Sequence, residues 1–207
     1  WRVLIGDMES LLTAADTGRK ASLPPKSTSF QAWSKQLADF SRTPDVMVQL
    51  PFWKQQCLPL PAPFPVDTPG GANTDSSTFL HSVGLTEAET ALLVSASARA
   101  FGTRTEDLLL SALLLSLWRW ADLNAVLVEM EAHGREDVLD GVDVSRTIGW
   151  FTAAYPIRLD LHAARIGGTD IAGVIKYVKE SLRRVPQHGL GFGLLRYGPG
   201  TTDAEKA

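Results

Sequence analysis

The sequence predicts an α/β fold in which helices and strands intermingle along the chain. Apolar residues recur at helical spacing in several stretches, whereas residues 124–132 and 155–161 alternate in polarity as strands do. A hydrophobic share of 44% and a charged share of 21% are ordinary for a soluble globular protein, so layers packed around a core are expected. The 207 residues suffice for one large domain or two small lobes.

Three helical segments are expected before residue 58. The first is amphipathic over residues 1–18, and the glycine at its end favours termination. A serine or threonine at 27–29 can cap the second, whose aromatic stripe over residues 30–40 is typical of a core. The third segment covers residues 44–56, where Pro51 can kink or divide the helix.

The middle of the chain begins with a loop, because residues 58–72 are rich in proline and glycine. Residues 78–85 alternate weakly and predict a strand. Thr-Glu-Ala-Glu at 86–89 is a capping-box pattern before a helix that ends near residue 100. Thr-Arg-Thr-Glu at 103–106 repeats the pattern, and residues 108–120 then predict a helix that is apolar on most sides and therefore buried.

The strand at 124–132 is followed by a charged connection, 134–143, that is expected to be exposed. A second strand is predicted at 155–161, with its apolar side chains on one side. Asp170 is expected to cap the last long helix, and residues 186–193 are expected to form a glycine-bearing loop.

The first of these strands has one apolar face and one ionisable face, because successive strand side chains point to opposite sides. Val128, Met130 and Ala132 share the apolar face, and Glu129, Glu131 and His133 share the other. A sheet with one face in water is one explanation. A metal site is an alternative, since carboxylates and imidazoles ligate metals, although this spacing matches no recognised metal signature.

Three ordered blocks resemble the epimerization domains of nonribosomal peptide synthetases, which belong to the condensation-domain superfamily. The blocks are Glu-Ala-His-Gly-Arg-Glu at 131–136, Asp-Val-Ser-Arg-Thr-Ile-Gly-Trp-Phe-Thr at 143–152, and residues 178–197, which look like the family's Val-Pro…Gly-x-Gly-Tyr-Gly segment. Related condensation domains commonly carry Gly-x-Phe-x-Asn, so the Trp-Phe-Thr form favours epimerization. With the intervening helices, the resemblance covers nearly the whole chain.

The resemblance implies a chloramphenicol-acetyltransferase-like, two-lobed, V-shaped fold around a central tunnel. Residues 1–85 would complete the first lobe, and 86–207 would form much of the second. The family's His-His-x-x-x-Asp-Gly and Phe-Asn-Tyr motifs do not occur in this sequence. The chain is therefore expected to be an incomplete, internal piece that lacks a catalytic histidine and is inactive alone.

The implied reaction converts an L-aminoacyl or peptidyl residue into its D form by removing and returning the α-proton. Such chemistry needs a base, a proton donor and stabilisation of the enolate oxygen. Glu131 matches the motif glutamate to which the resemblance gives an acid/base role. The alternatives are an amide-forming condensation domain, and a non-catalytic scaffold or docking piece.

Other site residues follow from the same resemblance. Arg135 would pair with the aspartate of the absent motif, and His133 would orient Glu131. Trp150, Phe151 and Thr152 are expected to line or floor the tunnel. His188 lies in the third block and is assigned no catalytic role.

The implied partner is a peptidyl carrier protein whose phosphopantetheine arm tethers the substrate, so no bound cofactor is expected. Neighbouring synthetase domains and the missing N-terminal part of the same domain are the other expected partners. The net charge of −3 implies no general attraction to nucleic acid, and no apolar run reaches membrane-spanning length. Cys57 is the only cysteine, which excludes an internal disulfide and fits a cytoplasmic location.

Overall fold

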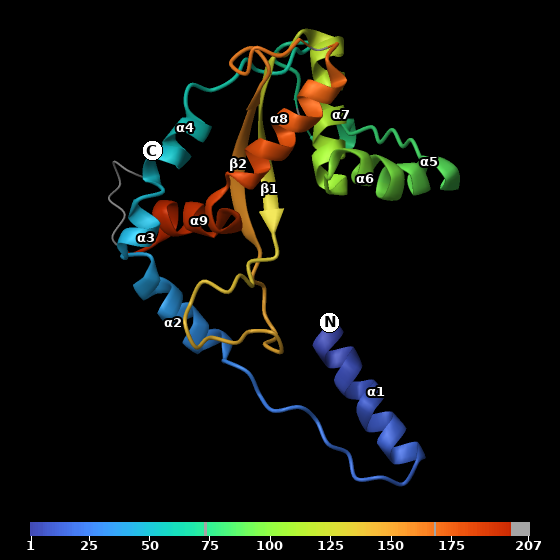
Figure 1. Ribbon diagram of the computed structural model, residues 1–207, viewed down its shortest axis with the longest axis vertical. Coiled ribbons are helices and arrows are strands. Elements are labelled where there is room, and N and C mark those ends of the chain that lie inside the picture. The colour runs from blue at the N-terminus through green and yellow to red at the C-terminus, as the bar shows by residue number, and fades with distance from the viewer. Residues whose placement is uncertain (73, 168, 200–207) are drawn as a thin grey trace. The chain divides into compact units, whose positions relative to one another are not determined.

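A computed structural model describes residues 1–72, 74–167 and 169–199, which contain helices and one pair of strands (Figure 1). Strand β1 (Ala125–Ala132) pairs with β2 (Ala153–Asp160). The N–H of Leu161 donates to the carbonyl of Asn124 at 2.8 Å, so the end of β2 meets the start of β1 and the strands are antiparallel. The predicted α/β class and both strands are confirmed.

The chain divides into two compact units, and both units contribute to the strand pair. Unit 1 contains residues 1–55, 129–155 and the segment from 186 onward. Unit 2 contains residues 56–128 and 156–185.

Unit 1 is built from short helices whose ends follow from local sequence. The Ser29 side chain accepts a hydrogen bond from the N–H of Ala32 at 3.1 Å and so begins α2. Pro51 lies in the first turn of α4, where a missing N–H costs nothing, and the predicted third helix is divided just before it. The helices of this unit are α1 (Arg2–Asp16), α2 (Phe30–Phe40), α3 (Pro44–Met47), α4 (Leu50–Cys57), the 3-10 turn η3 (Pro186–Gly189) and α9 (Leu190–Tyr197).

Unit 2 has its core between two long helices. Helix α7 packs against α8, and the side chains of Leu114, Val174 and Val178 are fully buried there. The Asp170 side chain caps α8 as predicted, accepting from the N–H of Gly173 at 2.9 Å. The elements of this unit are η1 (Asp75–Ser77), α5 (Glu87–Ala91), a π-helical turn (Leu92–Ser97), α6 (Ala98–Phe101), α7 (Thr105–Ala121) and α8 (Ile171–Arg183).

The strand β2 buries one face, as the alternation predicted. Ile157 and Leu159 are at most 1% exposed, while the intervening Arg158 is only half-buried. On β1, Val126 is buried, whereas Glu129 and Glu131 are exposed. The ionisable face of β1 is therefore the outer face within these 207 residues.

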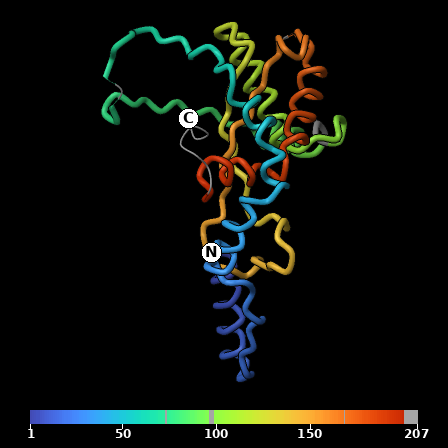
Figure 2. Tube along the Cα trace, turned by 90° about the vertical axis from the view of Figure 1, so that its left-hand side faces the viewer, coloured from blue at the N-terminus to red at the C-terminus, as the bar shows by residue number. Residues whose placement is uncertain are grey.

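The predicted strand at 78–85 is wrong, because this segment has no regular structure (Figure 2). A strand needs a hydrogen-bonded neighbour, and in the described part of the chain only β1 and β2 pair. Phe79, Leu80 and Val83 are each more than 80% exposed. Weak alternation alone therefore did not specify a strand here.

Two further expectations are corrected. Asp107, rather than residues 103–106, caps the start of α7, because its carboxylate accepts from the N–H of Arg104 at 2.7 Å. The predicted loop at 186–193 becomes helix α9 from Leu190 onward. A Cβ at Gly191 would meet the end of the Gln49 side chain, so Gln49 packs closely against the first turn of α9.

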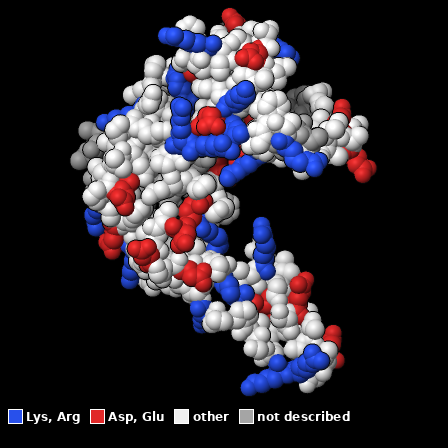
Figure 3. Space-filling model, viewed as in Figure 1, with Lys and Arg blue, Asp and Glu red and all other residues white. Residues whose placement is uncertain are grey.

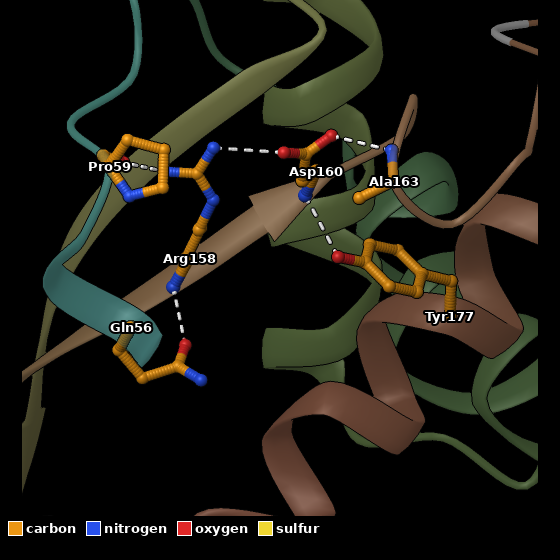
Figure 4. Close-up of polar contacts among 6 residues, drawn as sticks. All are labelled: Gln56, Pro59, Arg158, Asp160, Ala163 and Tyr177. Atoms are coloured by element: carbon orange, nitrogen blue, oxygen red, sulfur yellow. Dashed lines mark hydrogen bonds and ion pairs between the residues drawn. The ribbon is translucent and has the colours of Figure 1, made fainter. Parts of the chain in front are cut away.

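A polar network in unit 2 joins β2 to its neighbours (Figure 4). The backbone N–H of Arg158 donates to the Gln56 side chain at 2.8 Å, and its guanidinium donates to the carbonyl of Pro59. The Arg158 guanidinium also lies 2.9 Å from the carboxylate of Asp160. The N–H of Ala163 donates to that carboxylate at 2.8 Å, so Asp160 is held from two sides.

We expect Asp160 to make the stability of unit 2 pH-dependent. Burial alone would raise the pKa of Asp160, but the hydrogen bond from Ala163 and the Arg158 guanidinium outweigh burial and hold the pKa below its usual 3.8. A lowered folded-state pKa gives stability that is present above the unfolded-state pKa and is lost as the pH falls through the folded-state value. Urea unfolding should show Asp160→Asn less stable than wild type at pH 7, with the difference shrinking below about pH 3.8. A difference that is unchanged at lower pH would contradict this assignment.

Candidate active site

The candidate site lies at the end of β1, where Glu131 projects from the exposed face. The side chain of Glu131 makes no hydrogen bond or ion pair in the described part of the chain. The strand then turns sharply at Gly134, which has a φ of 67°. A Cβ at Gly134 would collide with the carbonyl oxygen of Phe151, so only glycine lets the first motif block approach the second.

Arg135 binds the second block directly. Its guanidinium donates to the carbonyls of Val144 and Thr147, the latter at 2.9 Å. The same guanidinium carbon lies 3.9 Å from the centroid of the Phe151 ring. A planar guanidinium can make two carbonyl bonds and a stacking contact at once, which a lysine cannot. Arg135 is therefore a connector between the blocks at 131–136 and 143–152.

The second block is also fixed to the segment before α2. The N–H of Asp143 donates to the Thr28 hydroxyl at 3.1 Å, and the N–H of Thr28 donates to the Asp143 carbonyl at 2.8 Å. The hydroxyls of Ser27 and Thr147 lie 2.9 Å apart. Hydrogen bonds from the side chain and backbone N–H of Ser145 lower the pKa of Asp143. This loop is therefore held in place although it has no regular secondary structure.

The two aromatic residues of the second block have different environments. Phe151 is 5% exposed and packs edge-on against Phe30 and Trp33, with ring centroids 5.2 and 4.7 Å away. Trp150 is 81% exposed, and Thr152 is half-buried. Phe151 thus anchors the loop in the core of unit 1, whereas Trp150 is available to contact other groups.

The third motif block places His188 close to Glu136 of the first motif block, which also lies close to His133. The imidazole of His133 accepts a hydrogen bond from the N–H of Arg135 at Nδ1, 3.0 Å away, and its Nε2 lies 3.3 Å from the Glu136 carboxylate. The Nε2 of His188 lies 3.8 Å from the other oxygen of Glu136. Neither Glu136 nor His188 was selected from the sequence. Their membership of motif blocks was the available signal, but only the fold brings them together.

The metal site considered above would need several ligating side chains in one group. In residues 1–72, 74–167 and 169–199, no three or more His, Cys, Asp or Glu side chains are grouped so that they could hold a metal ion.

Acidic and basic side chains are interspersed on the face shown in Figure 3. None of the described helices is long and apolar enough to cross a membrane.

A carboxylate near an imidazole at the end of a strand is chemically able to take part in proton transfer. The model of the condensation domain matches residues 1–206, and the chain belongs to that family. Surfactin synthase subunit 2 of Bacillus subtilis is 37% identical over 99% of the chain. The chondramide synthase of Chondromyces crocatus is 37% identical over 97%. The chain spans only 6% and 5% of these two synthases.

Solved structures show the same fold. The epimerization domain from the third module of tyrocidine synthetase B superposes with a TM-score of 0.82 and 33% identity, over 100% of this chain and 46% of that one. The first condensation domain of the CDA synthetase gives 0.66 and 16% identity, over 91% of this chain and 40% of that one. These neighbours are more than twice as long as this chain. The exposure of the Glu131 side chain is therefore its exposure within these 207 residues, without the remainder of a domain of that size.

Proposed function

We propose that the chain is part of an epimerization domain of a nonribosomal peptide synthetase. The observation that carries the proposal is the likeness to the tyrocidine synthetase epimerization domain, at 33% identity over the whole chain. The condensation domain of the CDA synthetase shares 16%. The Trp-Phe-Thr sequence at 150–152 supports the same choice.

The proposed reaction inverts one α-carbon of a thioester-bound aminoacyl or peptidyl residue. Glu131 exchanges the α-proton on one face, and the electron pair of the broken C–H bond is delocalised onto the thioester oxygen as an enolate. A group outside these 207 residues exchanges the proton on the opposite face. No atom is gained or lost, so the reaction needs no cofactor beyond the tether.

The proposed partner is a peptidyl carrier protein that presents the substrate on its phosphopantetheine arm. The relatives are synthases many times longer than this chain, which supports carrier and neighbouring synthetase domains as partners. We further propose that residues 1–85 and 86–207 belong to the two lobes of the complete domain. His133 and Arg135 shape the site around Glu131, together with Trp150, Phe151 and Thr152.

Solvent deuterium exchange tests the reaction class. The complete domain is incubated in D₂O with an aminoacyl carrier protein, and the amino acid is released for mass and chiral analysis. Epimerization predicts deuterium at the α-carbon and the appearance of the D form. A new amide bond with an acceptor-loaded carrier, without α-deuterium, would instead show a condensation domain.

A further inference from the structure

We propose that Glu136 is a positioning residue that fixes the imidazole of His133 beside Glu131 and joins it to His188 of the third block. The inference rests on the proposed epimerization, because it assigns a role within that site. Glu136 lies in the loop after β1, where its carboxylate is between the two imidazoles. The motif blocks alone do not predict this contact.

The hydrogen bond at His133 determines which nitrogen carries its proton. A neutral imidazole has one donor and one acceptor nitrogen. Because Nδ1 accepts from the N–H of Arg135, the proton of the neutral ring is on Nε2, which faces Glu136 at 3.3 Å. The carboxylate and the backbone therefore fix the ring from both sides. His133 directly follows the last residue of β1 and is two positions from Glu131 in the sequence.

Strained backbone brings the second imidazole to Glu136. Gln187 and His188 have φ values of 46° and 50°, a left-handed conformation that costs about 1–3 kcal/mol per residue unless the surroundings hold it. The Gln49 side chain donates to the Gln187 side chain at 2.9 Å. The ring of Tyr155 occupies the space that a Cβ at Gly189 would need. The turn is therefore held in the conformation that presents His188.

The burial of Glu136 agrees with this role. Its side chain is 15% exposed, whereas those of His133 and His188 are 69% and 60% exposed. The neighbouring Arg135 directs its guanidinium to the carbonyls of Val144 and Thr147. The ionisable partners of Glu136 in the described chain are thus the two histidines. Removing the carboxylate leaves the His133 ring held only through Nδ1.

The test compares Glu136→Gln with Asp137→Asn in the complete domain. Asp137 is exposed and adjacent, so its variant removes the same charge without touching the histidines. We expect Glu136→Gln to lower kcat for α-proton exchange about 10- to 100-fold with KM nearly unchanged, because misplacing a group at the reacting centre has effects of this size. Asp137→Asn should retain wild-type kcat.

A second readout does not depend on activity. Long-range ¹H–¹⁵N spectra of histidine-labelled protein should show the neutral ring of His133 as a single Nε2–H tautomer in wild type, and as a mixture of tautomers in Glu136→Ala. Combining Glu136→Gln with His188→Gln should cost less than the product of the single effects. Unchanged tautomer populations together with an unchanged kcat would overturn the positioning role. If wild type shows the single tautomer but no α-exchange, the epimerization proposal fails while the positioning contact stands.

Discussion

Glu131→Gln is expected to lower the rate of α-proton exchange by about a thousandfold in the complete domain. General acid–base catalysis contributes roughly 10²- to 10⁴-fold, and glutamine has nearly the same shape but cannot accept the proton. Deuterium incorporation into the carrier-bound amino acid measures the rate. Because the Glu131 side chain is exposed and makes no polar contact in the described chain, the free energy of unfolding of these 207 residues should change by less than about 0.5 kcal/mol.

The matched control is Glu129→Gln, which removes the same charge from the same exposed face of β1. It should leave the exchange rate within about threefold of wild type, since a charge change at the surface acts mainly through screened electrostatics. Equal losses in both variants would mean that the face acts through its charge alone. Full activity of Glu131→Gln would remove this residue from the mechanism.

Gly134→Ala is expected to destabilise the chain by about 2–5 kcal/mol. A left-handed backbone costs a non-glycine residue about 1–2 kcal/mol, and overpacking adds about 1–3 kcal/mol. Both terms apply because Gly134 has a φ of 67° and its Cβ would meet the Phe151 carbonyl. Urea unfolding measures the loss, and α-exchange should fall with it because the Arg135 connection is displaced.

Gly141→Ala separates the cost of the left-handed backbone from the cost of overpacking. Gly141 has a φ of 72°, but nothing lies within 4 Å of the position of its Cβ. This variant should therefore cost only the backbone term of about 1–2 kcal/mol and leave α-exchange unchanged. Equal destabilisation by the two alanines would show that the close approach to Phe151 contributes nothing to the stability of the turn.

The site combines two kinds of residue with different demands. Phe151 and Arg135 hold the second block in place through aromatic packing and carbonyl hydrogen bonds. Glu131 and Trp150 remain exposed in the described chain. A rigid scaffold that leaves a few groups accessible is what a proton-transfer site requires, because positioning contributes as much as the reacting group.

The sequence by itself determined the two strands β1 and β2 and the alternation of β1, since hydrophobic periodicity is a local property. It also determined the Asp170 cap, whose carboxylate binds an N–H three residues away. The motif blocks predicted the family correctly, because the family model matches residues 1–206, and they singled out Glu131, whose catalytic role stays a prediction.

Tertiary structure alone decided which blocks meet. Residues 78–85 alternate weakly but have no partner strand in the described chain, so local pattern could not make them a strand. The contact of Glu136 with His188 joins two positions that lie far apart in the sequence. Such contacts depend on backbone turns at Gly134 and at 187–189, whose left-handed conformations are stabilised by neighbours distant in the sequence.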